Sequence, residues 1–194
     1  PYFGGFMNLA AQEYLIPIQE YLDGEQKSDI RHEYLAGRVE PIAGAGEKHN
    51  RISLNMAFHL RAAARGKACG VFISDMKVRV EQNDAYYYPD VMVTCDTQDT
   101  EPFHKHAPCL IVEVLSPATE AIDRREKMTA YRTLPSLHYY LLVAQDKRQI
   151  EFFTRAPDNR WHTTIIENTG ILEILCDGFK ANFSLDDIYE DVYL

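Results

Sequence analysis

Apolar residues along the chain follow two patterns, one with helical spacing and one typical of strands. Positions three and four residues apart are apolar in three segments, which predicts helices over Ala10–Leu22, Glu47–Arg65 and Ala121–Leu134. Pro17 interrupts the first of these segments. The chain therefore has three helices of ordinary length, separated by segments of a different pattern.

Those other segments alternate apolar and polar residues or are continuously apolar, which is typical of strands. The predicted strands are Val71–Val80, Tyr86–Thr94, Cys109–Leu115, His138–Val143, Gln149–Thr154, Trp161–Glu167 and Leu172–Leu175. A short hairpin is predicted over His32–Ile42, with its turn at Ala36-Gly37, and Asp96–Pro108 is a polar loop. A last short helix is predicted to begin at Ser184 or Asp186, since either residue can cap a helix N-terminus.

Strands followed by a helix and a further strand indicate an α/β fold. We expect a central mixed β-sheet flanked by helices, with an N-terminal helix and hairpin. A length of 194 residues, 46% of them hydrophobic, suits one domain over residues 7–194. Residues 1–6 precede Met7 and are expected to be an expression remnant or an upstream extension.

The charge balance counts against a protein that simply coats phosphates. The net charge is −9, from 29 acidic and 20 basic residues, whereas such proteins are usually basic. No apolar run is long enough for a membrane span, and no signal peptide is recognisable. The four cysteines form no C-x-x-C pair, which predicts reduced, mostly buried thiols in a cytoplasmic protein without a membrane partner.

Two acidic residues lie in strongly apolar strands. Asp90 follows Pro89 at the start of an apolar run, and Glu113 stands in the middle of Leu110–Leu115, a run that predicts a strand buried on both faces. A buried carboxylate is costly unless it is paired or binds a metal. Two convergent carboxylates repel unless a cation lies between them, so the pair predicts a Mg²⁺ or Mn²⁺ site. A salt bridge to arginine, or an exposed edge strand, is the alternative for Glu113 alone.

The following helix supplies a cation. Asp123, Lys127 and Tyr131 are spaced four residues apart, so they lie on nearly one helix face. Lys127 is expected to reach back to a phosphate or an attacking water. An ordinary surface pair between Asp123 and Lys127 is the alternative explanation.

These residues resemble the Uma-type restriction endonuclease family, formerly a domain of unknown function, which belongs to the PD-(D/E)XK nuclease superfamily. The resemblance covers about residues 12–155 and is most specific from Glu113 to Thr119. The matching segments are Pro89-Asp90-Val91, Val112–Thr119, Asp123, Lys127, Tyr131, His32–Val39, His49 and Tyr139–Val143.

The resemblance implies a restriction-endonuclease-like core with Asp90 and Glu113 as metal ligands. The superfamily's usual lysine, two residues after the acid, falls at Leu115 in this chain. Lys127 on the following helix is expected to replace it. Glu33, Glu47, His49, Asp123 and Tyr131 are accessory candidates.

The predicted function is metal-dependent hydrolysis of phosphodiester bonds in DNA, with RNA left open as a substrate. A homodimer is expected, because a DNA duplex is itself nearly two-fold symmetric. The alternative is an inactive nuclease-fold module that binds nucleic acid or assembles with other proteins. The acidic net charge and Leu115 favour that alternative, whereas Asp90, Glu113 and Lys127 together favour catalysis.

Overall fold

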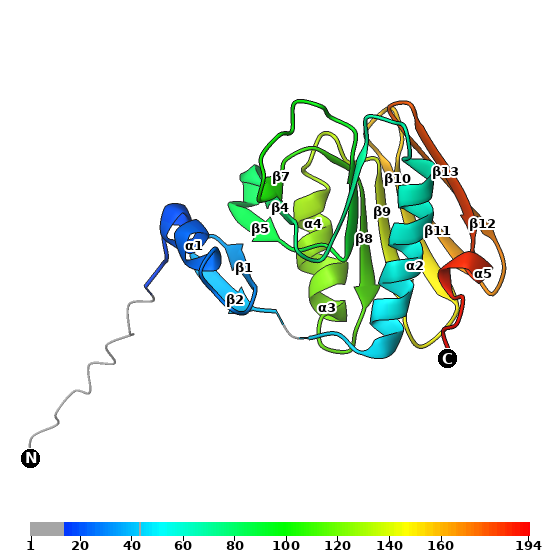
Figure 1. Cartoon of the computed structure of the whole chain (residues 1–194), viewed down its shortest axis with the longest axis horizontal. Coiled ribbons are helices and arrows are strands. Elements are labelled where there is room, and N and C mark those ends of the chain that lie inside the picture. The colour runs from blue at the N-terminus through cyan, green and yellow to red at the C-terminus, as the bar shows by residue number, and fades with distance from the viewer. Residues whose placement is uncertain (1–13, 43) are drawn as a thin grey trace, which may run out of the picture.

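A computed structural model describes residues 14–42 and 44–194 of the chain. These residues form two mixed β-sheets, a C-terminal two-stranded hairpin and a small number of helices (Figure 1). Residues 1–6, the expected start at Met7 and the first part of the predicted helix over Ala10–Leu22 lie outside the described residues.

The larger sheet has six strands in the order β11-β10-β9-β8-β6-β3. β8 and β9 are parallel and every other neighbouring pair is antiparallel, so the predicted mixed sheet is confirmed. All eight residues of β8 are buried, as the continuous apolar run predicted. The strands are β3 (Gly70–Ile73), β6 (Val91–Thr94), β8 (Pro108–Leu115), β9 (Tyr139–Ala144), β10 (Gln149–Arg155) and β11 (Trp161–Glu167).

Helices cover this sheet on both faces. α2 (Glu47–Ala63) packs on one face, together with the hairpin of β12 (Ile171–Cys176) and β13 (Phe179–Ser184). The other face packs against one continuous helix made of α3 (Glu120–Ile122), the π-helical turn η2 (Asp123–Lys127) and α4 (Met128–Tyr131), which connects β8 to β9 (Figure 1). No helix among the described residues is long and apolar enough to cross a bilayer.

The smaller sheet has the order β2-β1-β5-β4-β7 and carries the predicted N-terminal hairpin. Its strands are β1 (His32–Leu35), β2 (Arg38–Pro41), β4 (Lys77–Val80), β5 (Ala85–Tyr87) and β7 (His104–Lys105). Ala36 and Gly37 make the hairpin turn with φ values of 47° and 92°, which is the geometry that favours glycine. α1 (Ile18–Glu25) packs beside the hairpin through a cluster of Tyr21, Tyr34 and Tyr86.

Several predicted boundaries are wrong. The first helix does not run through Pro17 but begins after it, since proline is tolerated only at a helix start. The predicted strand Val71–Val80 is two strands of different sheets, β3 and β4, separated by a turn in which Ser74 has a positive φ. Tyr86–Thr94 is likewise β5 and β6, and β7 lies inside the segment predicted as loop.

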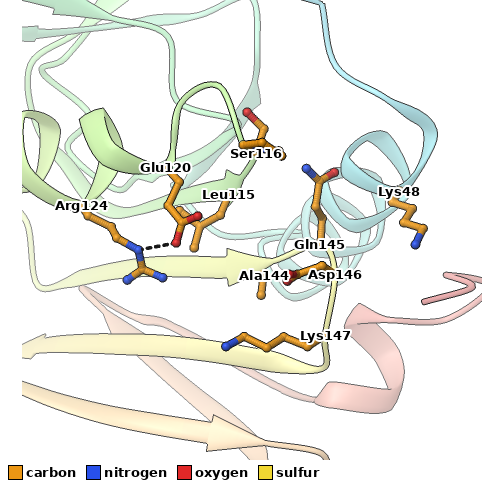
Figure 2. A pocket seen from close by; sticks show the side chains of 10 residues that line it. Lys48, Leu115, Ser116, Glu120, Arg124, Ala144, Gln145, Asp146 and Lys147 are labelled. Carbon is orange, nitrogen blue, oxygen red and sulfur yellow. Dashed lines mark hydrogen bonds and ion pairs between the residues drawn. The ribbon is translucent and has the colours of Figure 1, made fainter.

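An open pocket of about 320 Å³ lies where the parallel strands β8 and β9 end (Figure 2). Leu115 and Ala144, the last residues of the two strands, line it together with the start of α2 and of α3. Carboxyl ends of parallel strands are common positions for ligand sites in α/β proteins.

The C-terminal segment forms a hairpin of β12 (Ile171–Cys176) and β13 (Phe179–Ser184). Its first strand was predicted and its second was not. Ser184 caps the last helix, α5 (Leu185–Ile188), through a reciprocal capping box with Asp187, so Ser184 rather than Asp186 is the cap.

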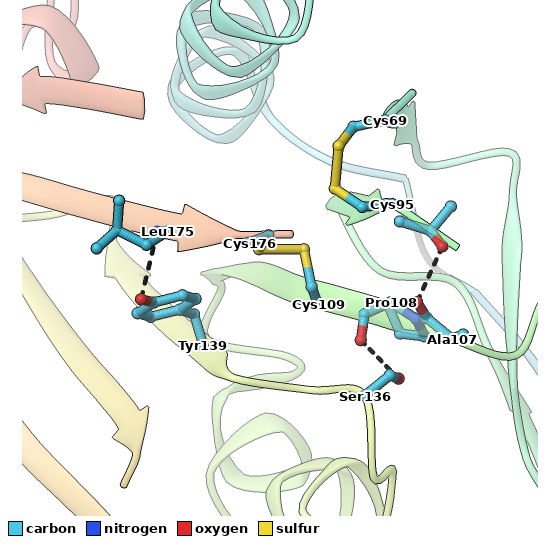
Figure 3. Close-up of a disulfide and its surroundings, with 10 residues drawn as sticks. Cys69, Cys95, Ala107, Pro108, Cys109, Ser136, Tyr139, Leu175 and Cys176 are labelled. Carbon is cyan, nitrogen blue, oxygen red and sulfur yellow. Dashed lines mark hydrogen bonds between the residues drawn. A yellow bond between two sulfur atoms is a disulfide. The ribbon is translucent and has the colours of Figure 1, made fainter. Parts of the chain in front are cut away.

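The cysteines form two disulfides, Cys69–Cys95 and Cys109–Cys176, so the prediction of reduced thiols is wrong (Figure 3). Cys69 and Cys95 extend the pairing of β3 with β6 by one residue beyond Gly70 and Thr94. Cys109 on β8 and Cys176 on β12 are buried, as predicted, but face each other in the same core. Only the folded topology brings these pairs together, because 26 and 67 residues of sequence separate them.

Candidate active site

Asp90 stands where the chain crosses from the smaller sheet to the larger one. β5 and β6 belong to different sheets, and Tyr88-Pro89-Asp90 connects them. Pro89 has no N–H to offer to a strand ladder, which suits a break in pairing. The Oδ2 atom of Asp90 accepts a hydrogen bond from the N–H of Val114 at 2.7 Å and lies 3.1 Å from Nε2 of His49. These two contacts hold the carboxylate against the end of β8.

Glu113 lies on the face of β8 that packs against the α3–η2–α4 helix, and only 3% of it is exposed. Its Oε1 atom accepts a hydrogen bond from the hydroxyl of Tyr131 at 2.8 Å and lies 3.4 Å from Nζ of Lys127. Burial raises the pKa of Glu113 well above its usual value; the charge of Lys127 opposes this rise, and neighbouring carboxylates add to it. The folded protein therefore buries the Glu113 carboxyl group, and this burial disfavours its ionised form, as the sequence had indicated.

The helix after β8 turns three polar side chains toward Glu113. Asp123 and Lys127 belong to the π-helical turn η2, and Tyr131 ends α4. All three are buried, which confirms the prediction that they share one face of the helix. A π-helical turn contains one residue more per hydrogen bond than an α-helix and is frequent at functional sites.

Lys127 is the centre of the cluster. Its Nζ atom lies 2.9 Å from Glu33, 3.3 Å from Asp123 and 3.4 Å from Glu113. Burial alone would lower the pKa of Lys127, but the charges of these carboxylates outweigh it and raise the pKa well above its usual value. The surrounding carboxylates therefore stabilise the ammonium form of Lys127.

The smaller sheet contributes Glu33, which the sequence had suggested only as an accessory carboxylate. Glu33 lies on β1, and its Oε1 atom also accepts a hydrogen bond from the N–H of Tyr88 at 3.2 Å. Glu47, the other accessory carboxylate, is not in the cluster. Its side chain is 75% exposed and pairs with Arg51 along the same helix.

His49 reaches Asp90 from the first turn of α2. Burial lowers the pKa of His49, but the hydrogen bond and charge of Asp90, together with the charge of Asp123, raise it more, and the net shift is upward. The contact with Asp90 therefore stabilises the protonated form of the His49 ring relative to a free histidine. The sequence placed His49 near the site but gave it no partner.

The cluster has more negative than positive charge. Three carboxylates (Glu33, Glu113 and Asp123) surround Lys127, and a fourth, Asp90, contacts His49, so four acidic side chains face two basic ones. The buried Oδ1 atom of Asp123 lies 3.3 Å from Nζ of Lys127 but makes no hydrogen bond of regular geometry among the described residues. Carboxylate oxygens are the ligands that Mg²⁺ and Mn²⁺ prefer, so the donor chemistry and the unbalanced charge fit a divalent cation.

The number of protein ligands is small. In the described part of the chain, no three side chains of histidine, cysteine, aspartate or glutamate are arranged to hold one ion. Two carboxylates suffice for Mg²⁺, which usually keeps several waters and takes substrate phosphate as a further ligand. The predicted ligand pair of Asp90 and Glu113 is compatible with that mode of binding.

One supporting residue was not found from the sequence. The buried hydroxyl of Tyr140 on β9 donates to the backbone carbonyl of Asp123 at 3.0 Å, so the neighbouring parallel strand fixes the start of the π-helical turn. Only the apolar character of this strand was visible in the sequence, where a tyrosine suggests packing. The available signal was the hydroxyl of Tyr140, which needs a partner when it is buried in a central strand.

Comparisons with known proteins agree with this architecture. Residues 18–187 match the model of the Uma2 family, described as "Putative restriction endonuclease". Two proteins of Synechocystis sp., the uncharacterized proteins sll1609 and slr1290, are 32% and 34% identical to the chain. Those matches cover 81% and 88% of this chain and 91% and 90% of the relatives.

A crystal structure from Anabaena variabilis, of a putative nuclease belonging to DUF820, has a similar fold. Its TM-score is 0.68 over 89% of this chain and 98% of that one, at 14% sequence identity. The family match covers most of the chain, and the fold agrees over nearly the same length. The chain belongs to the Uma2 family, the family of restriction-endonuclease-like proteins to which the sequence motifs had pointed.

Proposed function

We propose that this protein is a metal-dependent endonuclease that hydrolyses phosphodiester bonds in DNA, with Mg²⁺ or Mn²⁺ as its cofactor. One observation carries the proposal. Lys127, on the helix that follows β8, contacts Glu113 on β8, and Asp90 accepts a hydrogen bond from the backbone of the same strand. Membership of the Uma2 family supports it.

Asp90 and Glu113 are the residues that would hold the cation. A bound divalent cation supplies a more acidic water and offsets the charge of the phosphate. The chain's own contribution is orientation. The N–H of Val114 and the ring of His49 fix Asp90, and the hydroxyl of Tyr131 fixes Glu113.

Lys127 would place a fixed positive charge beside the reacting phosphate. Its high pKa keeps the ammonium protonated, so its role is electrostatic rather than that of a general base. His49 is the group whose proton can move, because its ring is hydrogen-bonded to Asp90 and its pKa lies above the usual value for histidine.

The second candidate function is a nuclease-fold module that binds nucleic acid or assembles without cutting. One observation favours it. Lys127 is only 6% exposed, and three carboxylates already surround its ammonium group. Such a lysine can serve the stability of the fold alone.

Cleavage assays with matched variants separate the two functions. The full chain is incubated with supercoiled plasmid, single-stranded DNA and RNA, in Mg²⁺, Mn²⁺ or EDTA, beside Asp90→Asn, Glu113→Gln and Lys127→Met. Glu47→Gln is the control, because it removes a carboxylate that lies outside the cluster. We expect the three site variants to lose at least about 10²-fold in rate, as is typical of a lost electrostatic stabiliser.

The endonuclease is supported if the parent and Glu47→Gln cleave the substrate only when the cation is present and the three site variants do not. Equal cleavage by the parent and Glu113→Gln would contradict the site. Binding of nucleic acid without cleavage in any cation would favour the second candidate. Light scattering during the same work tests the proposed homodimer, which a single monomeric species would contradict.

A further inference from the structure

The pocket at the ends of β8 and β9 lies beside the cluster of Asp90, Glu113 and Lys127. Leu115 lines the pocket and shares a strand face with Glu113, two residues away. Lys48 lines it from α2 and is the chain neighbour of His49, which contacts Asp90. A polymer bound at the carboxylates can therefore continue directly into the pocket.

The lining combines an apolar floor with a polar rim. Leu115, Pro117 and Ala144 form the apolar part, and Ser116 and Gln145 add a hydroxyl and an amide at the edge (Figure 2). The volume of about 320 Å³ is at the lower end of the range for small-molecule sites. The apolar atoms can contact a sugar or the edge of a base, and the neighbouring polar groups can form hydrogen bonds with it. This combination fits one nucleotide unit of a nucleic-acid strand.

Three cationic side chains surround the opening. Figure 2 shows Lys48 from α2, Lys147 from the turn after β9, and Arg124 from the helix after β8. Arg124 is already engaged by Glu120 and Glu151. Neither Lys48 nor Lys147 has an ion-pair partner among the described residues, so both are free to contact a phosphate.

Two acidic residues also line the pocket, Glu120 and Asp146. Glu120 is neutralised by Arg124 at 2.7 Å. Asp146 is exposed and would repel a phosphate. The residues that line the pocket thus include three cationic and two acidic side chains, in a chain of net charge −9.

We propose that this pocket binds the nucleotide unit next to the phosphodiester bond that is cut, with the phosphates that flank this unit facing Lys48 and Lys147. This inference rests on the proposed function, since it assigns a neighbouring subsite for the same substrate. The subsite adds two exposed cationic contacts to the buried Lys127 of the cluster, whose carboxylates repel the strand until a cation is bound.

Fluorescence anisotropy with a short labelled DNA strand, and with the matching duplex, tests the subsite apart from catalysis. Binding is measured over a series of salt concentrations, in EDTA and in Ca²⁺, for the full-length parent, Lys48→Ala and Lys147→Ala. Lys67→Ala is the matched control. Lys67 is also exposed but lies just beyond the other end of the 17-residue helix α2, about 25 Å from its start.

We expect each pocket variant to raise Kd about 3- to 10-fold. The slope of log Kd against log salt should fall by about one, which is the change expected for one lost phosphate contact. Asp146→Asn should change Kd in the opposite direction, because it removes a repulsive charge from the same pocket. Lys67→Ala should match the parent. The circular dichroism spectra of all variants should be the same, since every substituted side chain is exposed.

Each outcome separates the subsite from the proposed function. If the parent binds and cuts DNA but Lys48→Ala and Lys147→Ala bind as Lys67→Ala does, the subsite is wrong and the endonuclease stands. If the variants behave as expected but no cation supports cleavage, the endonuclease is wrong, and the pocket is a nucleic-acid contact that does not adjoin a cut bond. If the parent binds neither probe, both are overturned.

Discussion

Lys127 lies closer to Glu33 than to Glu113, at 2.9 Å against 3.4 Å. Glu33 belongs to the N-terminal hairpin and Glu113 to the central strand of the larger sheet. The lysine on the connecting helix therefore links the two sheets electrostatically. The N-terminal hairpin is therefore part of the site, because it supplies a carboxylate that contacts Lys127 although the two residues are far apart in the sequence.

The first prediction concerns this contact. Glu33→Gln should slow cleavage by about tenfold or more, because Lys127 loses its nearest carboxylate and is less firmly positioned beside the phosphate. Single-turnover cleavage measures the effect. Glu47→Gln, which alters an exposed carboxylate paired with Arg51, should leave the rate unchanged. Equal rates for the two variants would show that Glu33 does not position Lys127.

The second prediction concerns Lys77, a buried lysine outside the cluster. Its Nζ atom donates to the hydroxyl of Tyr88 at 3.2 Å, and burial lowers its pKa from the usual 10.5. A base whose pKa is lower in the folded state binds fewer protons there than in the unfolded chain. The free energy of unfolding should therefore rise as pH increases through the lowered pKa toward 10.5.

Lys77→Met tests this assignment. It should raise the free energy of unfolding at neutral pH and remove that part of the pH dependence. Urea denaturation at several pH values measures both effects. A variant that is less stable than the parent at neutral pH would mean that the contact with Tyr88 outweighs the cost of burial.

The third prediction concerns Tyr189, which joins the C-terminal helix to the turn between β9 and β10. Its hydroxyl lies 2.7 Å from the carbonyl oxygen of Ala144 and 2.9 Å from that of Gln149. Tyr189→Phe should lower the free energy of unfolding by about 1–2 kcal/mol, because buried acceptors lose their donor. Denaturation midpoints at neutral pH measure the loss.

The same residue predicts a behaviour in alkali. Burial raises the pKa of Tyr189 from 10.0 to about 12. Its contribution to stability is complete below pH 10.0 and is lost as pH rises through about 12. The stability difference between parent and Tyr189→Phe should shrink over that interval. A difference that stays constant with pH would show that the hydroxyl is not the source of the effect.

The fourth prediction concerns the Cys109–Cys176 disulfide, which joins β8 to the C-terminal hairpin across 67 residues of sequence. Removing it with Cys176→Ser should lower the free energy of unfolding by about 2–4 kcal/mol, because the unfolded chain regains the freedom that the closed loop withholds. Thermal unfolding with and without a reductant measures this. The reductant should destabilise the parent more than the variant, which retains only Cys69–Cys95.

The sequence predicted the parts of the site that depend on local pattern. Glu113 was recognisable because a carboxylate in a continuous apolar strand is costly, and Lys127 because it shares a helix face with Asp123. The contact between Glu33 and Lys127 could not be predicted in this way. It depends on how two separate sheets pack, and nothing in either local sequence records that packing.

The errors also have physical causes. Val71–Val80 was predicted as one strand because Val78 and Val80 alternate with charged residues, whereas the polar pair Ser74-Asp75 within it makes a turn in which Ser74 has a positive φ. Pro89 inside the predicted strand Tyr86–Thr94 did carry a warning, because proline is rare within a central strand. The pairing of the cysteines was beyond reach, since four cysteines allow three different connectivities.

The presence of the lysine on the helix instead of the strand changes what position 115 can do. Leu115 is uncharged and contributes at once to the core beneath the helix and to the floor of the pocket. An exchange of Leu115 for another apolar residue alters the shape of that floor and leaves the charges around Glu113 as they were. The shape of the pocket and the charges of the cluster can therefore change independently, whereas a lysine at position 115 would tie both properties to one side chain.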